Sequence, residues 1–160
     1  MFESNYLAID RCRSVRSTAF QLIFLGLPLG GLIAFVMYLA NENRHNAQVF
    51  ILIVIVPYTL FATFFVGYAT ILMIKRWNRT INKIDIESGN LSAETFPIFW
   101  YKSKRYVIKV SDVILNNTTF PWYGKEKKEG IVIKVGKEEL YFVKDYFDDY
   151  ESILNSISSN

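Results

Sequence analysis

Two segments of the chain combine aromatic rings with basic side chains. Residues 99–105 read FWYKSKR, and residues 120–130 read FPWYGKEKKEG. Aromatic rings stack on nucleobases, at about 1 to 3 kcal/mol per base, and neighbouring cations bind phosphate oxygens. Together the segments predict a site for an anionic ligand, made of Trp100, Lys102, Lys104, Arg105, Trp122, Tyr123, Lys125, Lys127 and Lys128.

The same side chains allow two other interpretations. Rings and lysines also suit the headgroup zone of a bilayer. Alternatively, Trp100 and Trp122 belong to a core and the lysines are solvated loop charges. The formal net charge is only +3, which argues against a broad basic surface for duplex nucleic acid and leaves a small anionic nucleotide as the expected ligand class.

The residues that carry most enzyme chemistry are scarce. His45 and Cys12 are the only histidine and cysteine, and neither has a partner at the spacing of a catalytic triad or a metal site. Asp148 and Asp149 suit the first turn of a helix better than an acid/base pair. We expect no catalysis, no metal and no cofactor.

Two long runs without charged residues dominate the first half of the chain. Residues 18–40 would form roughly 33 Å of helix, and residues 49–74 roughly 39 Å with a tilt or a bend at Pro57. Both exceed a hydrocarbon core of about 30 Å. The sequence therefore predicts a helical hairpin, over 18–75, that spans a bilayer.

Basic residues flank this hairpin on one side, whereas the connecting loop contains only Arg44. The flanking residues are Arg11, Arg13, Arg16, Lys75, Arg76 and Arg79. By the positive-inside rule, both termini lie in the cytoplasm. We expect the protein in the bacterial inner (plasma) membrane.

Small residues recur at helical spacing within both runs, a pattern that lets helices approach closely in lipid. They serve packing within the hairpin or between subunits of a homo-oligomer. The set is Gly26, Gly30, Ala34, Thr59, Thr63 and Gly67.

After the basic residues Lys75, Arg76 and Arg79, the sequence changes to an alternation of apolar and polar residues. Apolar and polar residues alternate near 84–87, 91–96, 106–110, 131–135 and 140–142, which predicts five or six short antiparallel strands. Asp145 is a candidate cap for a final helix whose apolar residues include Tyr150 and Leu154.

The expected fold is therefore an α+β membrane protein. It consists of a cytoplasmic lead-in at 1–17, the hairpin at 18–75, and a cytoplasmic domain at 80–160. In that domain a small antiparallel sheet or partial barrel is closed by a C-terminal helix.

The run from Ile84 to Ile157, with VIKVSDV at 107–113 and a Gly-Lys hairpin at 136–137, is similar to bacterial pleckstrin-homology-like domains. Such a domain on a transmembrane hairpin would imply an accessory or immunity-type membrane protein that binds a partner protein.

The whole plan, two N-terminal spans followed by a compact domain, also resembles small membrane effectors of bacterial antiviral systems. These include effectors of cyclic-oligonucleotide defence and type III CRISPR ancillary effectors. This resemblance implies a signalling function: a nucleotide second messenger such as cyclic oligoadenylate binds the domain and rearranges the oligomeric helices to perturb the membrane.

Overall fold

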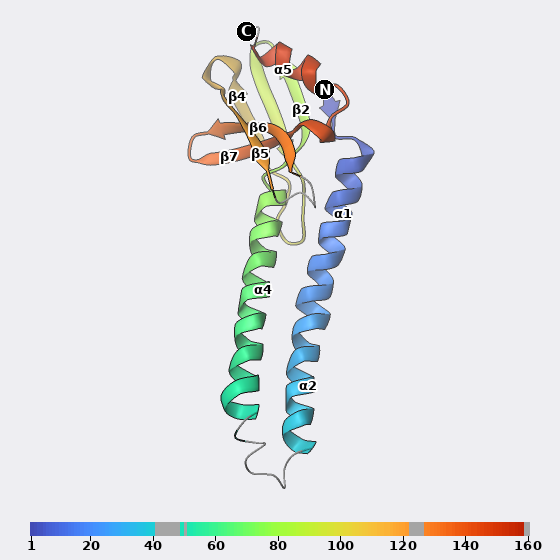
Figure 1. The fold of residues 1–160 in the computed structure, drawn as a ribbon. Helices are drawn as coiled ribbons and strands as arrows, with labels where there is room; N and C mark the ends of the chain where they lie inside the picture. The colour runs from blue at the N-terminus through green and yellow to red at the C-terminus, as the bar shows by residue number, and fades with distance from the viewer. Residues whose placement is uncertain (41–48, 50, 122–126, 159–160) are drawn as a thin grey trace. The chain divides into compact units, whose positions relative to one another are not determined.

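The computed structural model describes residues 1–40, 49, 51–121 and 127–158. Contacts divide these residues into two units. The first, called here the strand unit, contains Met1–Arg16 and Met73–Asn160, and the second, called the helix unit, contains Ser17–Leu72. Figure 1 shows helix α2 (Leu27–Ala40) and α4 (Val56–Trp77), most of which belong to the helix unit, and the β-strands of the other unit.

Each long helix contains one wider, π-helical turn. The turn η1 (Gln21–Gly26) joins α1 (Tyr6–Phe20) to α2, and η2 (Ile51–Ile55) precedes α4. Each turn ends two residues before a proline, Pro28 or Pro57. A proline has no N–H and its ring clashes with the carbonyl four residues earlier, so a wider turn accommodates it within a continuing helix.

The strands form two antiparallel sheets. The four-stranded sheet has the order β1-β2-β3-β4 and the three-stranded sheet the order β5-β6-β7. Their bounds are Phe2–Glu3, Ile81–Glu87, Asn90–Thr95 and Arg105–Lys109 for the first, and Ile114–Phe120, Lys128–Val135 and Glu138–Val143 for the second. The coarse prediction of an α+β chain with two long apolar helices and antiparallel strands is confirmed.

A short junction links the two sheets. Thr80 forms a parallel bridge with Tyr141, and the amide of Tyr141 donates to the carbonyl of Arg79 at 2.9 Å. Beside it, the buried Asn78 side chain donates to the carbonyls of Phe96, at 2.9 Å, and Lys102, at 3.1 Å. The segment between α4 and β2 is thereby fixed to β7 and to the backbone at Phe96 and Lys102.

The core of the strand unit is aromatic near this junction. Trp77 is 1 % exposed and stacks on Tyr146, with ring centroids 5.7 Å apart. It meets Phe96 edge-on at 5.6 Å. Because aromatic side chains bury large areas, Trp77 anchors the last turn of α4 in the strand unit.

The N-terminal segment differs from the lead-in expected at 1–17, because it is part of the strand unit. Phe2 pairs with Ile84 and Glu3 with Lys83, which makes β1 an edge strand. Asn5 then caps α1, its side-chain oxygen accepting the amide of Ala8 at 3.2 Å. A strand of two residues has no alternation to detect, so the pattern did not reveal it.

Two further differences concern the strand unit. The strand β5 was not expected, since its residues 116–119 are all polar, NNTT. The last helix, α5 (Tyr150–Ser158), begins five residues after the expected cap Asp145, which lies in the 3-10 turn η4 (Lys144–Tyr146). The carbonyl of Asp149 instead accepts the amide of Ile153 in the first turn, at 3.0 Å.

Candidate functional site

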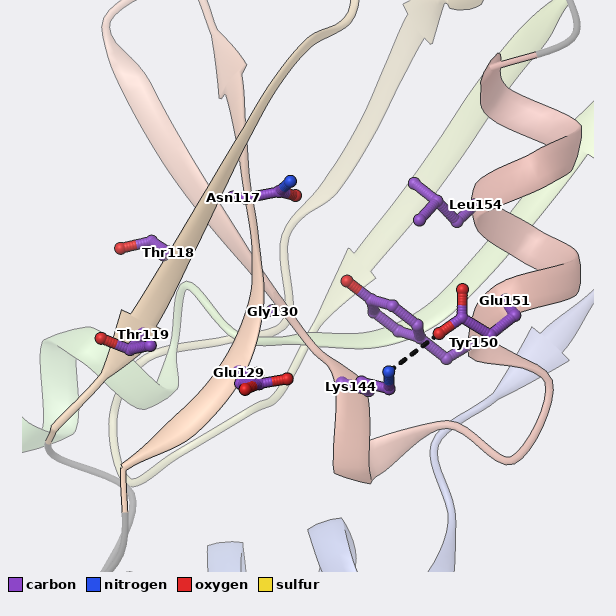
Figure 2. Close-up of a pocket in the computed structure, with 9 residues that line it drawn as sticks. All are labelled: Asn117, Thr118, Thr119, Glu129, Gly130, Lys144, Tyr150, Glu151 and Leu154. Atoms are coloured by element: carbon purple, nitrogen blue, oxygen red, sulfur yellow. Dashed lines mark ion pairs between the residues drawn. The ribbon is translucent and has the colours of Figure 1, made fainter.

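A cavity of about 640 Å³ lies in the strand unit between β5, β6 and the helix α5. We call it the β5–α5 cavity. Figure 2 shows Asn117 on β5 facing Tyr150 and Leu154 on α5 across it. Its lining residues are Asn117, Thr118, Thr119, Glu129, Gly130, Lys144, Tyr150, Glu151 and Leu154.

Gly130 on β6 allows the backbone of β7 to come close behind the cavity. A Cβ atom at this position would lie 2.9 Å from the Cα of Val143 and 2.8 Å from a ring carbon of Phe120, and closer still to the carbonyl oxygen of Phe142. Two of these three neighbours are backbone atoms that cannot rotate away. Only glycine fits here without a shift of the strands.

Tyr150 forms part of the opposite wall. It is 7 % exposed, and its ring stacks on Phe142 with centroids 4.7 Å apart. Burial, with smaller contributions from Glu151 and Glu129, raises the pKa of the Tyr150 hydroxyl to about 12. The hydroxyl is therefore a neutral donor and acceptor at physiological pH, and Figure 2 shows it pointing into the cavity.

The charges of the cavity are one lysine and two glutamates. Lys144 lies 2.9 Å from Glu151 in an ion pair whose side chains are 47 % and 65 % exposed. For Glu129, which is exposed, no ion pair is recorded within residues 1–40, 51–121 and 127–158. The cavity thus has a net negative charge, and Glu129 is its available carboxylate.

The strand β5 is the edge of its sheet. All seven of its residues pair with β6, from Ile114 opposite Lys134 to Phe120 opposite Lys128. No strand within the described ranges pairs with its other side. In an antiparallel ladder, alternate residues direct their N–H and C=O groups away from the partner strand. β5 therefore presents backbone donors and acceptors beside the cavity.

Two described members of the predicted anion site, Lys104 and Lys128, meet carboxylates near opposite ends of the three-stranded sheet. Lys104 pairs with Glu138 at 3.1 Å, and Lys128 pairs with Asp145 at 2.6 Å. Glu138 lies opposite Val135 in the register of β6 and β7, seven residues along β6 from Lys128, or about 23 Å at 3.3 Å per residue. Both cations already have a carboxylate partner, and they do not converge.

The other predicted ligand-binding residues are placed as follows. Trp100 is 60 % exposed, so it is not a core residue, and Lys102 and Lys127 are exposed. Arg105 donates from Nε to the Ser92 hydroxyl at 2.9 Å. Three members lie outside the described residues: Trp122, Tyr123 and Lys125. The proposal of one anion site therefore stays a prediction.

Trp100 stands at a tight turn. Ile98 and Tyr101 exchange two backbone hydrogen bonds of 3.0 Å, and Phe99 between them has φ +53°. That value is uncommon for a bulky residue and marks local strain. The turn holds the rings of Phe99 and Trp100 with centroids 5.5 Å apart.

Some of the predicted small-residue set lies where the long helices meet. The position a Cβ would take at Gly30 is 3.8 Å from Cγ2 of Thr59. Gly26 and Thr63 line the same apolar cavity of about 320 Å³, and Ala34 lines a second of about 340 Å³. A Cβ at Gly67 would meet no atom within 4 Å. The Thr59 hydroxyl donates to the carbonyl of Ile55 at 2.8 Å, so it is satisfied within its own helix.

Sequence reasoning missed most of the β5–α5 cavity, because its residues come from three separate segments of unremarkable composition. One signal was available: Gly130 precedes the alternating run Ile131 to Val135, and glycine inside a strand often marks a close backbone approach. The described residues contain no group of three His, Cys, Asp or Glu arranged to hold a metal ion.

Comparison of the chain with protein-family models, curated proteins and solved structures found no match.

Proposed function

We propose that this protein is a membrane-anchored binding protein. Two helices cross the bilayer, and the strand unit captures an extended segment of a partner protein by strand addition to β5. The observation that carries the proposal is the outer edge of β5 beside the β5–α5 cavity, with which no other described strand pairs. Of the two functions that the resemblances imply, this is the accessory type, in which the domain binds a partner protein.

Two apolar helices with little buried surface support the membrane part. The helical stretches Tyr6–Ala40 and Ile51–Trp77 are long enough to cross a bilayer. In their most apolar segments, 0 % and 6 % of the residues, respectively, are buried. Core helices of soluble proteins would bury such residues, whereas Phe61, Phe64 and Phe65 are each at least 63 % exposed. A lipid environment accounts for this exposure.

Strand addition supplies main-chain hydrogen bonds, and neighbouring cavities supply selectivity for side chains. Here an added strand would pair with the backbone of β5 and direct alternate side chains toward Tyr150 and Leu154. The hydroxyl of Tyr150 and the amide of Asn117 offer polar contacts. Because Glu129 leaves a net negative charge, we expect a segment with one lysine or arginine beside an apolar residue.

The experiment uses the full chain in lipid nanodiscs and a displayed library of ten-residue peptides. We expect enrichment of peptides that alternate polar and apolar residues and contain a basic residue. A selected peptide should slow hydrogen exchange of amides in Ile114–Phe120. Binding without protection of β5 would contradict strand addition, and failure to enrich any peptide would reject the proposal.

A charge reversal tests the predicted chemistry. Glu129→Lys should weaken binding of the basic peptides by about 5-fold or more, since an opposite charge becomes a like charge. Glu87→Lys is the matched control: Glu87 is also an exposed carboxylate on a strand, at the end of β2 and outside the cavity. Equal loss in the two variants would show a general charge effect instead of a site.

A nucleotide messenger remains a second candidate, favoured by the strained turn that exposes Trp100 next to the exposed Lys102. In the effector hypothesis this ring stacks on a base. The same nanodisc sample, titrated with a panel of cyclic di- and oligonucleotides, tests it through Trp100→Ala. Binding that is unaffected by this substitution would remove Trp100 from the site, and absence of binding at micromolar concentration would reject the effector hypothesis.

A further inference from the structure

A second, smaller cavity of the strand unit has basic walls. It measures about 200 Å³ and is lined by Ile9, Cys12, Arg13, Arg16 and Phe96. The four residues from α1 are spaced i, i+3, i+4 and i+7, so they share one face of the helix. Phe96, 4 % exposed, closes the cavity from the loop after β3. We call it the Arg13–Arg16 cavity.

The polar chemistry of this cavity is cationic. No carboxylate lines it, and no ion pair of Arg13 or Arg16 is recorded within residues 1–40, 51–121 and 127–158. Guanidinium groups bind phosphate through paired hydrogen bonds and remain charged at all physiological pH values. Ile9 and Phe96 add apolar surface next to the cations. This combination suits a phosphate attached to an apolar tail.

The place of the cavity in the chain selects the source of that phosphate. Arg16 is the last charged residue before an uncharged run at 17–41. It is also the last residue of α1 that lines the cavity. If the run crosses the bilayer, as proposed above, then Arg16 lies at the depth of the lipid headgroups. A lipid phosphate at that level reaches the cavity without leaving the membrane.

We propose that the Arg13–Arg16 cavity binds the phosphodiester of an anionic phospholipid. The two arginines contact the phosphate oxygens, and Ile9 and Phe96 contact the start of an acyl chain. The site is separate from the β5–α5 cavity, with which it shares no lining residue. It rests on the proposed membrane crossing but not on the binding of a partner peptide.

Cys12 offers a built-in reporter, because it is the only cysteine in the chain and lines the cavity. The full chain is reconstituted into nanodiscs of phosphatidylcholine alone or with added phosphatidylglycerol. The rate of alkylation by uncharged N-ethylmaleimide is followed by intact mass. We expect phosphatidylglycerol to slow the reaction by about 5-fold or more, because an anionic headgroup held by the two arginines would cover Cys12.

Single substitutions locate the effect. In Arg13→Gln and Arg16→Gln, the ratio of rates without and with phosphatidylglycerol should fall toward one. Arg11→Gln is the matched control, because Arg11 is exposed on the same helix but does not line the cavity. It should retain the ratio of the unsubstituted chain. An equal fall in all three variants would indicate general attraction to the surface and overturn the site.

Two further outcomes separate the sources of phosphate and the two proposals. Inorganic phosphate added to phosphatidylcholine discs should not protect Cys12, and equal protection by it would overturn the lipid assignment. Equal alkylation rates in both kinds of disc would overturn the lipid site while leaving the membrane crossing intact. Failure of the chain to enter either disc would instead reject the proposed spans.

Discussion

Replacement of Gly130 by alanine tests the geometry behind the β5–α5 cavity. The new Cβ would be 2.8 Å from a ring carbon of Phe120 and 2.9 Å from the Cα of Val143, well inside ordinary van der Waals contact. The Phe120 ring has room to tilt only by disturbing its contact with Tyr141, whose centroid is 5.4 Å away. The backbone atoms of Phe142 and Val143 move only if β7 moves.

The magnitude follows from two opposing effects. Overpacking a tight interior costs about 1 to 3 kcal/mol. Alanine regains about 0.5 to 1 kcal/mol over glycine in a strand, because glycine loses more conformational entropy on folding. Since two of the three close neighbours belong to the backbone, we expect overpacking near the upper end of its range, and therefore a net loss of about 2 kcal/mol.

The assay is thermal unfolding of the strand unit in the detergent-solubilised full chain, followed by near-ultraviolet circular dichroism. A loss of about 2 kcal/mol corresponds to a fall in Tm of roughly 10 °C for a unit of this size. Gly67→Ala is the control for the assay, because a Cβ there meets no atom within 4 Å and the site lies in the helix unit.

A Gly130→Ala chain as stable as the unsubstituted one, within about 0.5 kcal/mol, would refute the close approach of β6 and β7 at this point. A second variant isolates the backbone contribution. Phe120→Leu combined with Gly130→Ala removes the ring contact but not the two backbone contacts, so it should not restore stability. Full restoration would assign the whole effect to the ring.

Two further predictions concern the strand unit. Asn78→Leu removes a buried donor and leaves two carbonyls unpaired, so urea unfolding should show a loss of about 2 kcal/mol or more, whereas an unchanged midpoint would exclude the two hydrogen bonds. The hydrogen bond from Tyr106, followed by that from Lys104, lowers the pKa of Glu138 below its ordinary value of 4.5. Its stabilising effect is therefore present above pH 4.5 and is lost as pH falls through the folded-state value. Glu138→Gln should be less stable near neutrality, and its difference from the unsubstituted chain should shrink in acid; a constant difference would contradict the pairing.

The sequence predicted those elements whose pattern is local. Uncharged runs at 18–40 and 49–74 marked the long helices, because an apolar helix of that length needs no partner segment to be recognised. Alternation marked β2, β3, β4, β6 and β7 within a few residues of their observed bounds. Burial alternates along β3 and β4, which is the condition that produces this pattern, whereas Leu140 to Val143 of β7 are all buried.

β5 escaped prediction for the converse reason. Its middle residues are polar on both faces: Asn116, Asn117 and Thr119 are exposed, and Thr118 is half-buried. A strand at a sheet edge that borders a cavity has little apolar surface to bury on either side, so it produces no period of two.

The N-terminal strand could not be predicted because its partner is distant in sequence. The Ser4 amide donates to the carbonyl of Asn82 at 2.7 Å, and the two residues are joined by the whole helical hairpin. Closing a flexible loop costs entropy that rises with the logarithm of its length. The hydrogen bonds of a two-residue strand do not offset that cost for a long flexible loop. Helices Tyr6–Ala40 and Ile51–Trp77 replace most of that loop with rigid structure.

Contacts beyond its ladder also hold β1 in the strand unit. Asn5 reinforces the closure: its amide nitrogen donates to the carbonyl of Asp145 and to a carboxylate oxygen of Asp148, both at 3.0 Å, while its side-chain oxygen caps α1. One residue thus ties the start of the first helix to the turn that precedes α5. The last turn of α4 is likewise held in the strand unit, by the buried Trp77 and by the hydrogen bonds of the adjacent Asn78.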